Sequence, residues 1–155
     1  MPSTSTLLRP PTIELEVLMW SRQLQKTRFD DYVALRFLSN AIFSLRAAQS
    51  SELGPTSRCQ MALEGIYALC LGSIYLHGLL PLGQEGHREL VIQVATELMG
   101  LPMAERHQIL AAKKQLEALT CDTVESLDEQ DVRYMGAISH KALSQAQHVY
   151  PDWFE

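Results

Sequence analysis

Apolar residues along this chain recur every three or four positions, the spacing that places them on one face of an α-helix. The segments between these runs are short and hold most of the glycine and proline, as loops do. No stretch alternates apolar and polar residues in the manner of a β-strand, so no strand is expected. The pattern predicts six helices, at residues 12–26, 31–50, 57–77, 87–99, 102–119 and 126–148.

The order of these helices predicts an all-α fold class, an antiparallel up-and-down bundle of five to six helices joined by short loops. The segment 57–77 is apolar on nearly every side and should be the central helix. Asp30 or Asp31 can cap the helix that follows them. Ser126 and Glu129 have the spacing of a capping box at the start of the last helix.

The chain divides into three predicted parts. Residues 1–11 contain two adjacent prolines and are expected to form a flexible N-terminal lead-in. Residues 12–149 form the helical bundle domain. Residues 150–155 form an aromatic C-terminal tail, in which Trp153 is too apolar to be left in water. We expect this tail to fold back onto its own domain, with docking onto a partner subunit as the alternative.

Composition narrows the range of functions. Apolar residues make up 46% and charged residues 20% of the 155 residues, which is typical of one folded domain rather than a disordered chain. The net charge is −5 and the sequence contains no basic stretch, which disfavours general nucleic-acid binding. No sufficiently long run of residues is apolar enough to cross a bilayer, so no membrane association is expected.

The three cysteines, Cys59, Cys70 and Cys121, have no CxxC spacing. Their spacing and odd number disfavour a disulfide framework and a structural zinc site, and they favour a reducing cytoplasm. Histidine and acidic residues do not cluster as metal ligands, and there is no phosphate-binding glycine loop or GxSxG nucleophile motif. We therefore expect no metal ion and no cofactor.

Several marked positions in the middle of the chain are similar to a known family. In chain order they are Arg58, Ala62, Tyr67, Gly78, Gly86-His87, Leu90-Val91-Ile92 and Met99-Gly100-Leu101. This order of helix and loop positions resembles the HEPN superfamily, the small helical bundles of many bacterial toxin–antitoxin and nucleotidyltransferase-linked systems. The similarity covers roughly residues 35–148.

The resemblance implies a chemistry that this sequence departs from. The resemblance implies a metal-independent ribonuclease, often a homodimer, as in active HEPN members. Their motif is an Arg–polar pair followed by a His or Tyr, and it lies near the turn before the last helix. In that region, residues 111–122, the Arg–polar pair is missing and Cys121 stands where His or Tyr is expected. Lys113 and Lys114 keep positive charge there but lack arginine's planar fork. Together with the loop residue His87 they are the candidate binding residues.

One pair of residues elsewhere matches the spacing of the motif. Arg133 and His140 are seven positions apart, about two helical turns, so their side chains share a face. An arginine can hold a phosphate while a histidine moves a proton near neutral pH, which makes them the candidate catalytic pair. The alternative is a surface arginine and an unrelated histidine, because Tyr134 stands at the polar position and the pair lies inside the last helix.

Three functions stay open at this point. The first is a catalytically degenerate HEPN-like bundle that acts as a dimerisation and binding module, with a nucleotidyltransferase or antitoxin as partner. The second is a metal-independent HEPN-type ribonuclease, a toxin using Arg133 and His140 across the cleft of a homodimer. The third is a regulatory bundle that binds a nucleotide or another small molecule between its helices. The acidic charge and the degenerate motif favour the first and disfavour an enzyme acting on RNA.

Overall fold

The computed structural model of the chain describes residues 24–82, 87–121 and 127–154. Helices dominate these residues, and the predicted all-α bundle is confirmed. In chain order the elements are β1 (Leu24–Lys26), α2 (Asp31–Ala47), α3 (Pro55–Leu76), β2 (Leu79–Pro81), α4 (His87–Leu98), α5 (Met103–Cys121), α6 (Glu129–Val149) and the 3-10 helix η1 (Pro151–Trp153). The predicted lead-in and most of the helix predicted at 12–26 lie outside the described residues.

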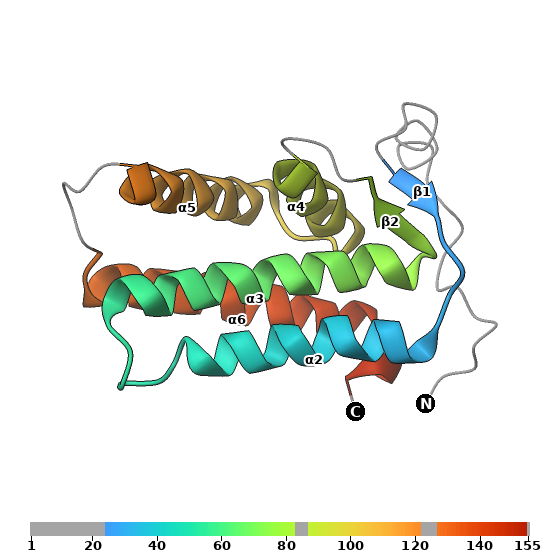
Figure 1. The fold of residues 1–155 in the computed structure, drawn as a ribbon, viewed down its shortest axis with the longest axis horizontal. Coiled ribbons are helices and arrows are strands. Elements are labelled where there is room, and N and C mark those ends of the chain that lie inside the picture. Colours follow the sequence, from blue (N-terminus) through green and yellow to red (C-terminus); the bar gives the residue numbers. More distant parts are fainter. Residues whose placement is uncertain (1–23, 83–86, 122–126, 155) are drawn as a thin grey trace.

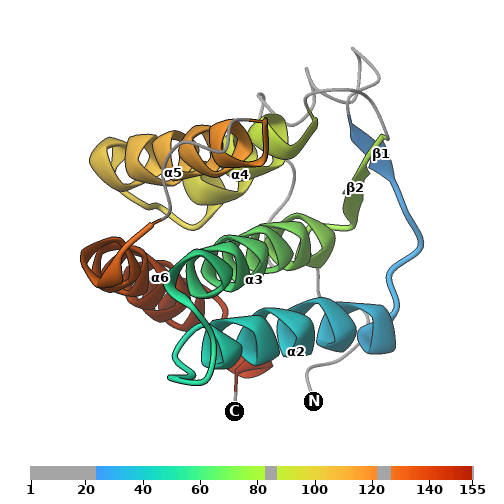
Figure 2. The same cartoon turned by 60° about the vertical axis from the view of Figure 1, so that its left-hand side comes forward.

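α3 is the central helix, as its apolar sequence predicts. It contacts α2, α4, α5 and α6, with α2 on one side and α4 and α5 on the other (Figure 1 and Figure 2). α2 and α3 run antiparallel, as do α5 and α6, whereas α4 is inclined to them (Figure 1). By length and composition α3 could cross a membrane, but 61% of its most apolar window is buried inside the bundle, as in the core helix of a globular protein.

α2 and α3 pack closely because two glycines of α3 leave room for leucines of α2. A Cβ atom at Gly65 would lie 2.7 Å from Leu45 Cδ2, and one at Gly72 would lie 2.9 Å from Leu38 Cδ2. The two glycines are about two turns apart, and so are the two leucines, so each pair shares a face of its helix. Leucine therefore meets glycine twice along the contact.

A short antiparallel sheet corrects two predictions: that the chain has no strand, and that a helix reaches residue 26. Leu24 of β1 lies opposite Pro81 of β2, and Lys26 lies opposite Leu79. Gly78, at φ 76°, ends α3 and turns the chain into β2. Leu24 and Leu79 are buried, so pairing and burial outweigh the local helical pattern. Strands this short carry no periodicity of their own.

Aspartate side chains cap α2 and α6. Asp30 is the N-cap of α2, and its Oδ1 accepts a hydrogen bond from the N–H two residues further on at 2.8 Å. At α6 the capping box consists of Asp128 and Asp131, so the prediction of Ser126 and Glu129 is wrong. The Asp131 N–H lowers the pKa of the Asp128 carboxyl. This cap therefore stabilises α6 above the ordinary pKa of an aspartate and weakens as the pH falls through the lowered value.

The C-terminal tail packs on its own domain. Trp153 is 7% exposed and meets the Phe29 ring edge-on, with 5.9 Å between the ring centroids. Phe29 also stacks on Tyr75 of α3 at 5.4 Å. Tyr150 is buried, and its hydroxyl lies 3.2 Å from Nε2 of the buried His77. An aromatic cluster thus joins the segment before α2, the end of α3 and the tail.

The close contact of α2 with α3 can be tested against a glycine that has room. Gly65→Ala should destabilise the protein by about 1–3 kcal/mol, because the new methyl group must displace Leu45 or the backbone of α2. Gly136→Ala, in α6 with no atom within 4 Å of the new Cβ, should stabilise it by about 0.5–1 kcal/mol through helix propensity. Urea unfolding followed by circular dichroism measures both. Equal effects of the two substitutions would contradict the contact.

Candidate functional site

A groove between α2, α3 and α6 receives both residues of the candidate catalytic pair. We name it the α2–α3–α6 groove, and its volume is about 260 Å³. Its polar lining residues are Gln49, Arg58, Arg133, Ser139 and His140. The rest of the described lining is apolar or glycine, contributed by all three helices.

α6 determines where the pair stands. The helix buries Val132, Met135 and Ile138 against the bundle. Arg133 and His140 lie beside these buried positions and are both exposed. Because they are about two turns apart, they line the same groove. The structure thus brings together the two residues that their spacing singled out.

Arg58 is the third cationic side chain of the groove. From the start of α3 its Nε donates a hydrogen bond to the carbonyl of Ala48 at 2.9 Å, and its Nη1 donates one to Glu129 Oε2 at 3.2 Å. Ala48 is the C-cap of α2, and Glu129 is the first residue of α6. One guanidinium therefore joins three helices. Sequence reasoning marked Arg58 only as a family position and missed its place in the groove.

The groove is cationic in an acidic protein. Two arginines and a histidine line it, and no Asp or Glu is among its described lining residues, whereas the whole chain has a net charge of −5. Glu129 offsets part of the charge of Arg58. In the described parts of the chain, no carboxylate pairs with Arg133 or His140. Such a lining can hold a phosphate or carboxylate, because arginine offers a fork of N–H donors and a protonated histidine offers another.

The other candidate binding residues lie on α4 and α5. Lys113 is buried in α5, where its Nζ binds Glu117 one turn further on and lies 3.9 Å from Glu89 of α4. Its charge is therefore engaged between these two helices. Lys114 is exposed on α5, and His87 begins α4 with its side chain outside the described part of the chain. Neither lysine lines the groove, so the structure separates them from the catalytic candidates.

Two buried thiols are unsuited to nucleophilic chemistry. Burial raises the pKa of the Cys70 thiol to about 12. Burial, and next the negative charge of Asp131, raise the pKa of the Cys59 thiol. With raised pKa values both thiols stay protonated near neutral pH. They are therefore poor nucleophiles, because the thiolate is the reactive form. Within residues 24–82, 87–121 and 127–154, no group of three His, Cys, Asp or Glu side chains could hold a metal ion.

A smaller cavity and a surface pair complete the polar features. The cavity, of about 170 Å³, lies between α3, α5 and α6, and its described lining includes Asp131 but no cation. On α3, Tyr67 supports the guanidinium of Arg88, which lies 4.4 Å above its ring and binds Glu64 at 2.8 Å. Tyr67, one of the family-like positions, therefore contributes to the contact of α3 with α4. Neither feature gathers several charges of one sign, as the groove does.

Comparisons of the chain with models of protein families, with curated proteins and with solved structures found no match. What the groove can bind follows from its own residues. Its distinguishing feature is that cationic side chains from α3 and α6 meet there with no carboxylate among its described lining residues.

Thiol chemistry tests the burial of the two cysteines. In a Cys121→Ser variant, Cys59 and Cys70 should react only very slowly with Ellman's reagent at about pH 8 while the protein is folded. The reason is that both side chains are buried, and that the Cys70 thiol, with a pKa of about 12, is ionised to only about one part in ten thousand at that pH. Both thiols should react at once in concentrated urea. Rapid reaction of the folded protein would show that the thiols are accessible, against the structure.

Proposed function

We propose that this chain is a HEPN-like helical-bundle binding module that holds an anionic ligand in the α2–α3–α6 groove and does not transform it. The observation that carries the proposal is the lining of the groove by Arg58, Arg133 and His140 without a carboxylate among its described lining residues. A phosphate or carboxylate on the ligand would supply the matching negative charge. The chain as a whole has a net charge of −5, so the groove is a local region of positive charge on an acidic protein.

The same lining favours binding over acid–base catalysis. Cleavage of a phosphodiester needs one group that accepts a proton and another that donates one. Histidine is the side chain that most often performs such transfers, and His140 is the one histidine among the lining residues that the structure describes. Ser139 donates its hydroxyl hydrogen to the Met135 carbonyl at 2.7 Å within α6. A lone histidine supplies half of the required proton transfers.

The size of the groove suits a compact ligand. Its volume of about 260 Å³ is just under the roughly 300–1,000 Å³ of typical small-molecule sites. Leu45, Val132 and Leu143 give it apolar walls beside the cations, which fits a ligand with an anionic end and an apolar or flat body. A nucleotide has this chemistry. In the HEPN-like role, the protein partner would be a second copy, a nucleotidyltransferase or an antitoxin.

Anion binding tests the proposal directly. Titration calorimetry of the full chain with inorganic phosphate, adenosine monophosphate and guanosine monophosphate should show binding of at least one of them. Arg133→Ala should weaken that binding about tenfold or more, because it removes charge-assisted hydrogen bonds. Lys114→Ala, which removes an exposed cation of α5 outside the groove, is the matched control and should bind as the wild type does.

Two outcomes would overturn the proposal. If both substitutions weaken binding equally, the anion responds to net charge and not to the groove. If none of the three anions binds, the groove does not have the chemistry assigned to it. Arg133 is exposed, so its variant should keep the melting temperature of the ligand-free protein, and a loss of binding cannot be ascribed to unfolding.

A ribonuclease is the second candidate, because Arg133 and His140 line one groove. Under the binding proposal, purified protein incubated with RNA in the presence of EDTA should leave the RNA intact, and its expression should not arrest growth. Cleavage that disappears in His140→Ala would establish catalysis at this site and replace the binding-only proposal. Cleavage that persists in His140→Ala would point to a contaminating nuclease.

A further inference from the structure

Two aromatic side chains stand out from the surface of α2. Tyr32 is 78% and Phe43 is 71% exposed, more than any other large apolar side chain in the described residues. They are eleven positions apart, about three turns and 20°, so they lie along one line of the helix. Arg36 and Ser39, both exposed, fall on the same line between them. These four residues form the α2 ridge.

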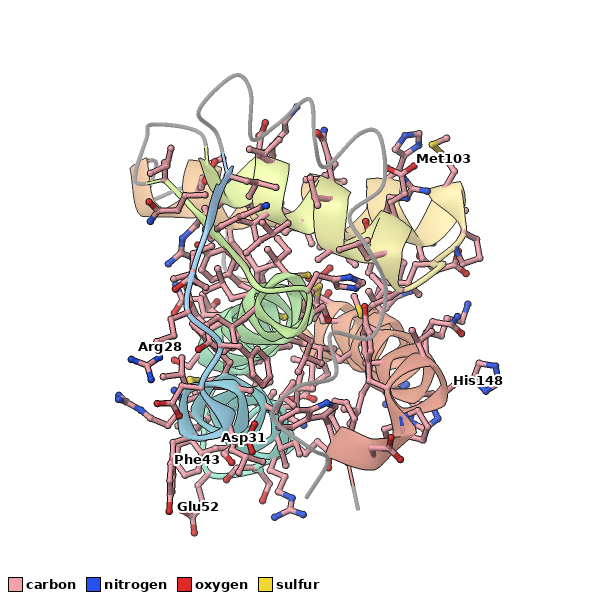
Figure 3. The ribbon with its side chains drawn as sticks, turned by 90° about the vertical axis from the view of Figure 1, so that its right-hand side faces the viewer. Arg28, Asp31, Phe43, Glu52, Met103 and His148 are labelled. Carbon is pink, nitrogen blue, oxygen red and sulfur yellow. The ribbon has the colours of Figure 1, made fainter. Side chains whose placement is uncertain are left out.

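The ridge faces away from the bundle and from the groove. On its opposite face α2 buries Ala34, Leu38, Ala41 and Leu45, and Leu45 also lines the groove. Figure 3 shows Phe43 pointing out of the bundle. Aromatic side chains and arginine are the residue types that contribute most to binding at protein interfaces. The ridge therefore has the composition of a contact surface that is independent of the groove.

The ridge is nearly the same in both directions: aromatic, polar, polar, aromatic. A two-fold axis level with the middle of the ridge would place a second α2 antiparallel across the first. Tyr32 would then face the partner's Phe43, and Arg36 would face the partner's Ser39, whose hydroxyl can accept a hydrogen bond. Two aromatic pairs would lie at the ends of the contact, and two arginine–serine pairs would lie in its middle. A surface that complements itself in this way fits a second copy of the chain.

Charge also favours the antiparallel arrangement. Asp30 and Asp31 lie at the N-terminal end of α2, and Arg46 lies in its last turn. Antiparallel pairing brings each acidic end level with the partner's Arg46. It also sets the two helix dipoles side by side in opposite directions, which is the favourable arrangement. Parallel pairing would bring like charges together and set Arg36 beside the partner's Arg36. The charges of α2 thus select one of the two orientations.

The available area places this contact at the small end of specific interfaces. α2 has 17 residues, which gives a length of about 25 Å. An aromatic side chain buries about 150–250 Å², so four of them with their polar neighbours bury on the order of 1,000 Å² in total, the lower limit for a specific interface. We propose that two copies of this chain associate antiparallel through the α2 ridge, reversibly and with a dissociation constant in the micromolar range.

Sedimentation equilibrium of the full chain, from low to high micromolar concentration, tests this dimer. The wild type should pass from monomer to dimer over the range. Tyr32→Lys and Phe43→Glu should each raise the dissociation constant about tenfold or more. The double variant should regain most of the lost affinity, because each introduced lysine then faces an introduced glutamate of the partner. In a parallel dimer, by contrast, like charges would meet and the double variant would stay monomeric.

Met103→Glu is the matched control. Met103 is 60% exposed on α5, at the opposite corner of the molecule from Phe43 (Figure 3), so its variant should associate as the wild type does. All three substituted side chains are exposed, and circular dichroism should show every variant folded. A wild type that stays monomeric, single variants that still associate, or a double variant that does not recover would each overturn the proposal. Tyr32→Lys should leave phosphate binding unchanged, so the dimer and the groove can fail separately.

Discussion

The contact of leucines on α2 with glycines on α3 is the constraint on which the rest of the structure depends. Gly65 and Gly72 allow the two helices to approach more closely than any larger residue would permit. Leu45 faces Gly65 on this contact and is also a wall of the α2–α3–α6 groove. The spacing of the two helices therefore sets the position of one side of the groove. Stability and site are linked through the same side chain.

Arg58 connects this packing to the charge of the groove. Its hydrogen bonds to Ala48 and Glu129 hold the guanidinium in place between α2 and α6. Arg133, by contrast, projects from α6 with an exposed side chain. The groove thus combines one cation fixed by the fold with one whose orientation a ligand can set. A fixed donor lowers the entropic cost of binding, and an adaptable one tolerates differences between ligands.

Local patterns account for what the sequence predicts well. Five of the six predicted helices are found in the described residues, because their apolar periodicity is a property of each segment by itself. The shared face of Arg133 and His140 follows from spacing within one helix for the same reason. The sheet of β1 and β2 was missed because its residues come together only through pairing across the fold.

The remaining differences between the predicted and the observed structure arise where several residues could fill the same role. Ser126 with Glu129 and Asp128 with Asp131 both fit a capping box by spacing. Glu129 pairs with Arg58 of α3 instead, and Asp128 and Asp131 form the box. The role of Arg58 in the groove could not be predicted either, since Arg133 and His140 are distant from it along the chain. In each case a contact between distant segments decides among options that are locally equivalent.

The packing of Trp153 against Phe29 has a consequence for the order in which the fold forms. The two residues are 124 positions apart along the chain, and their rings meet with 5.9 Å between the centroids. Their contact therefore closes a much longer loop than any contact within a helix, and contacts of this kind form slowly. A folding species that has its helices but not this contact exposes an apolar face to chaperones and proteases.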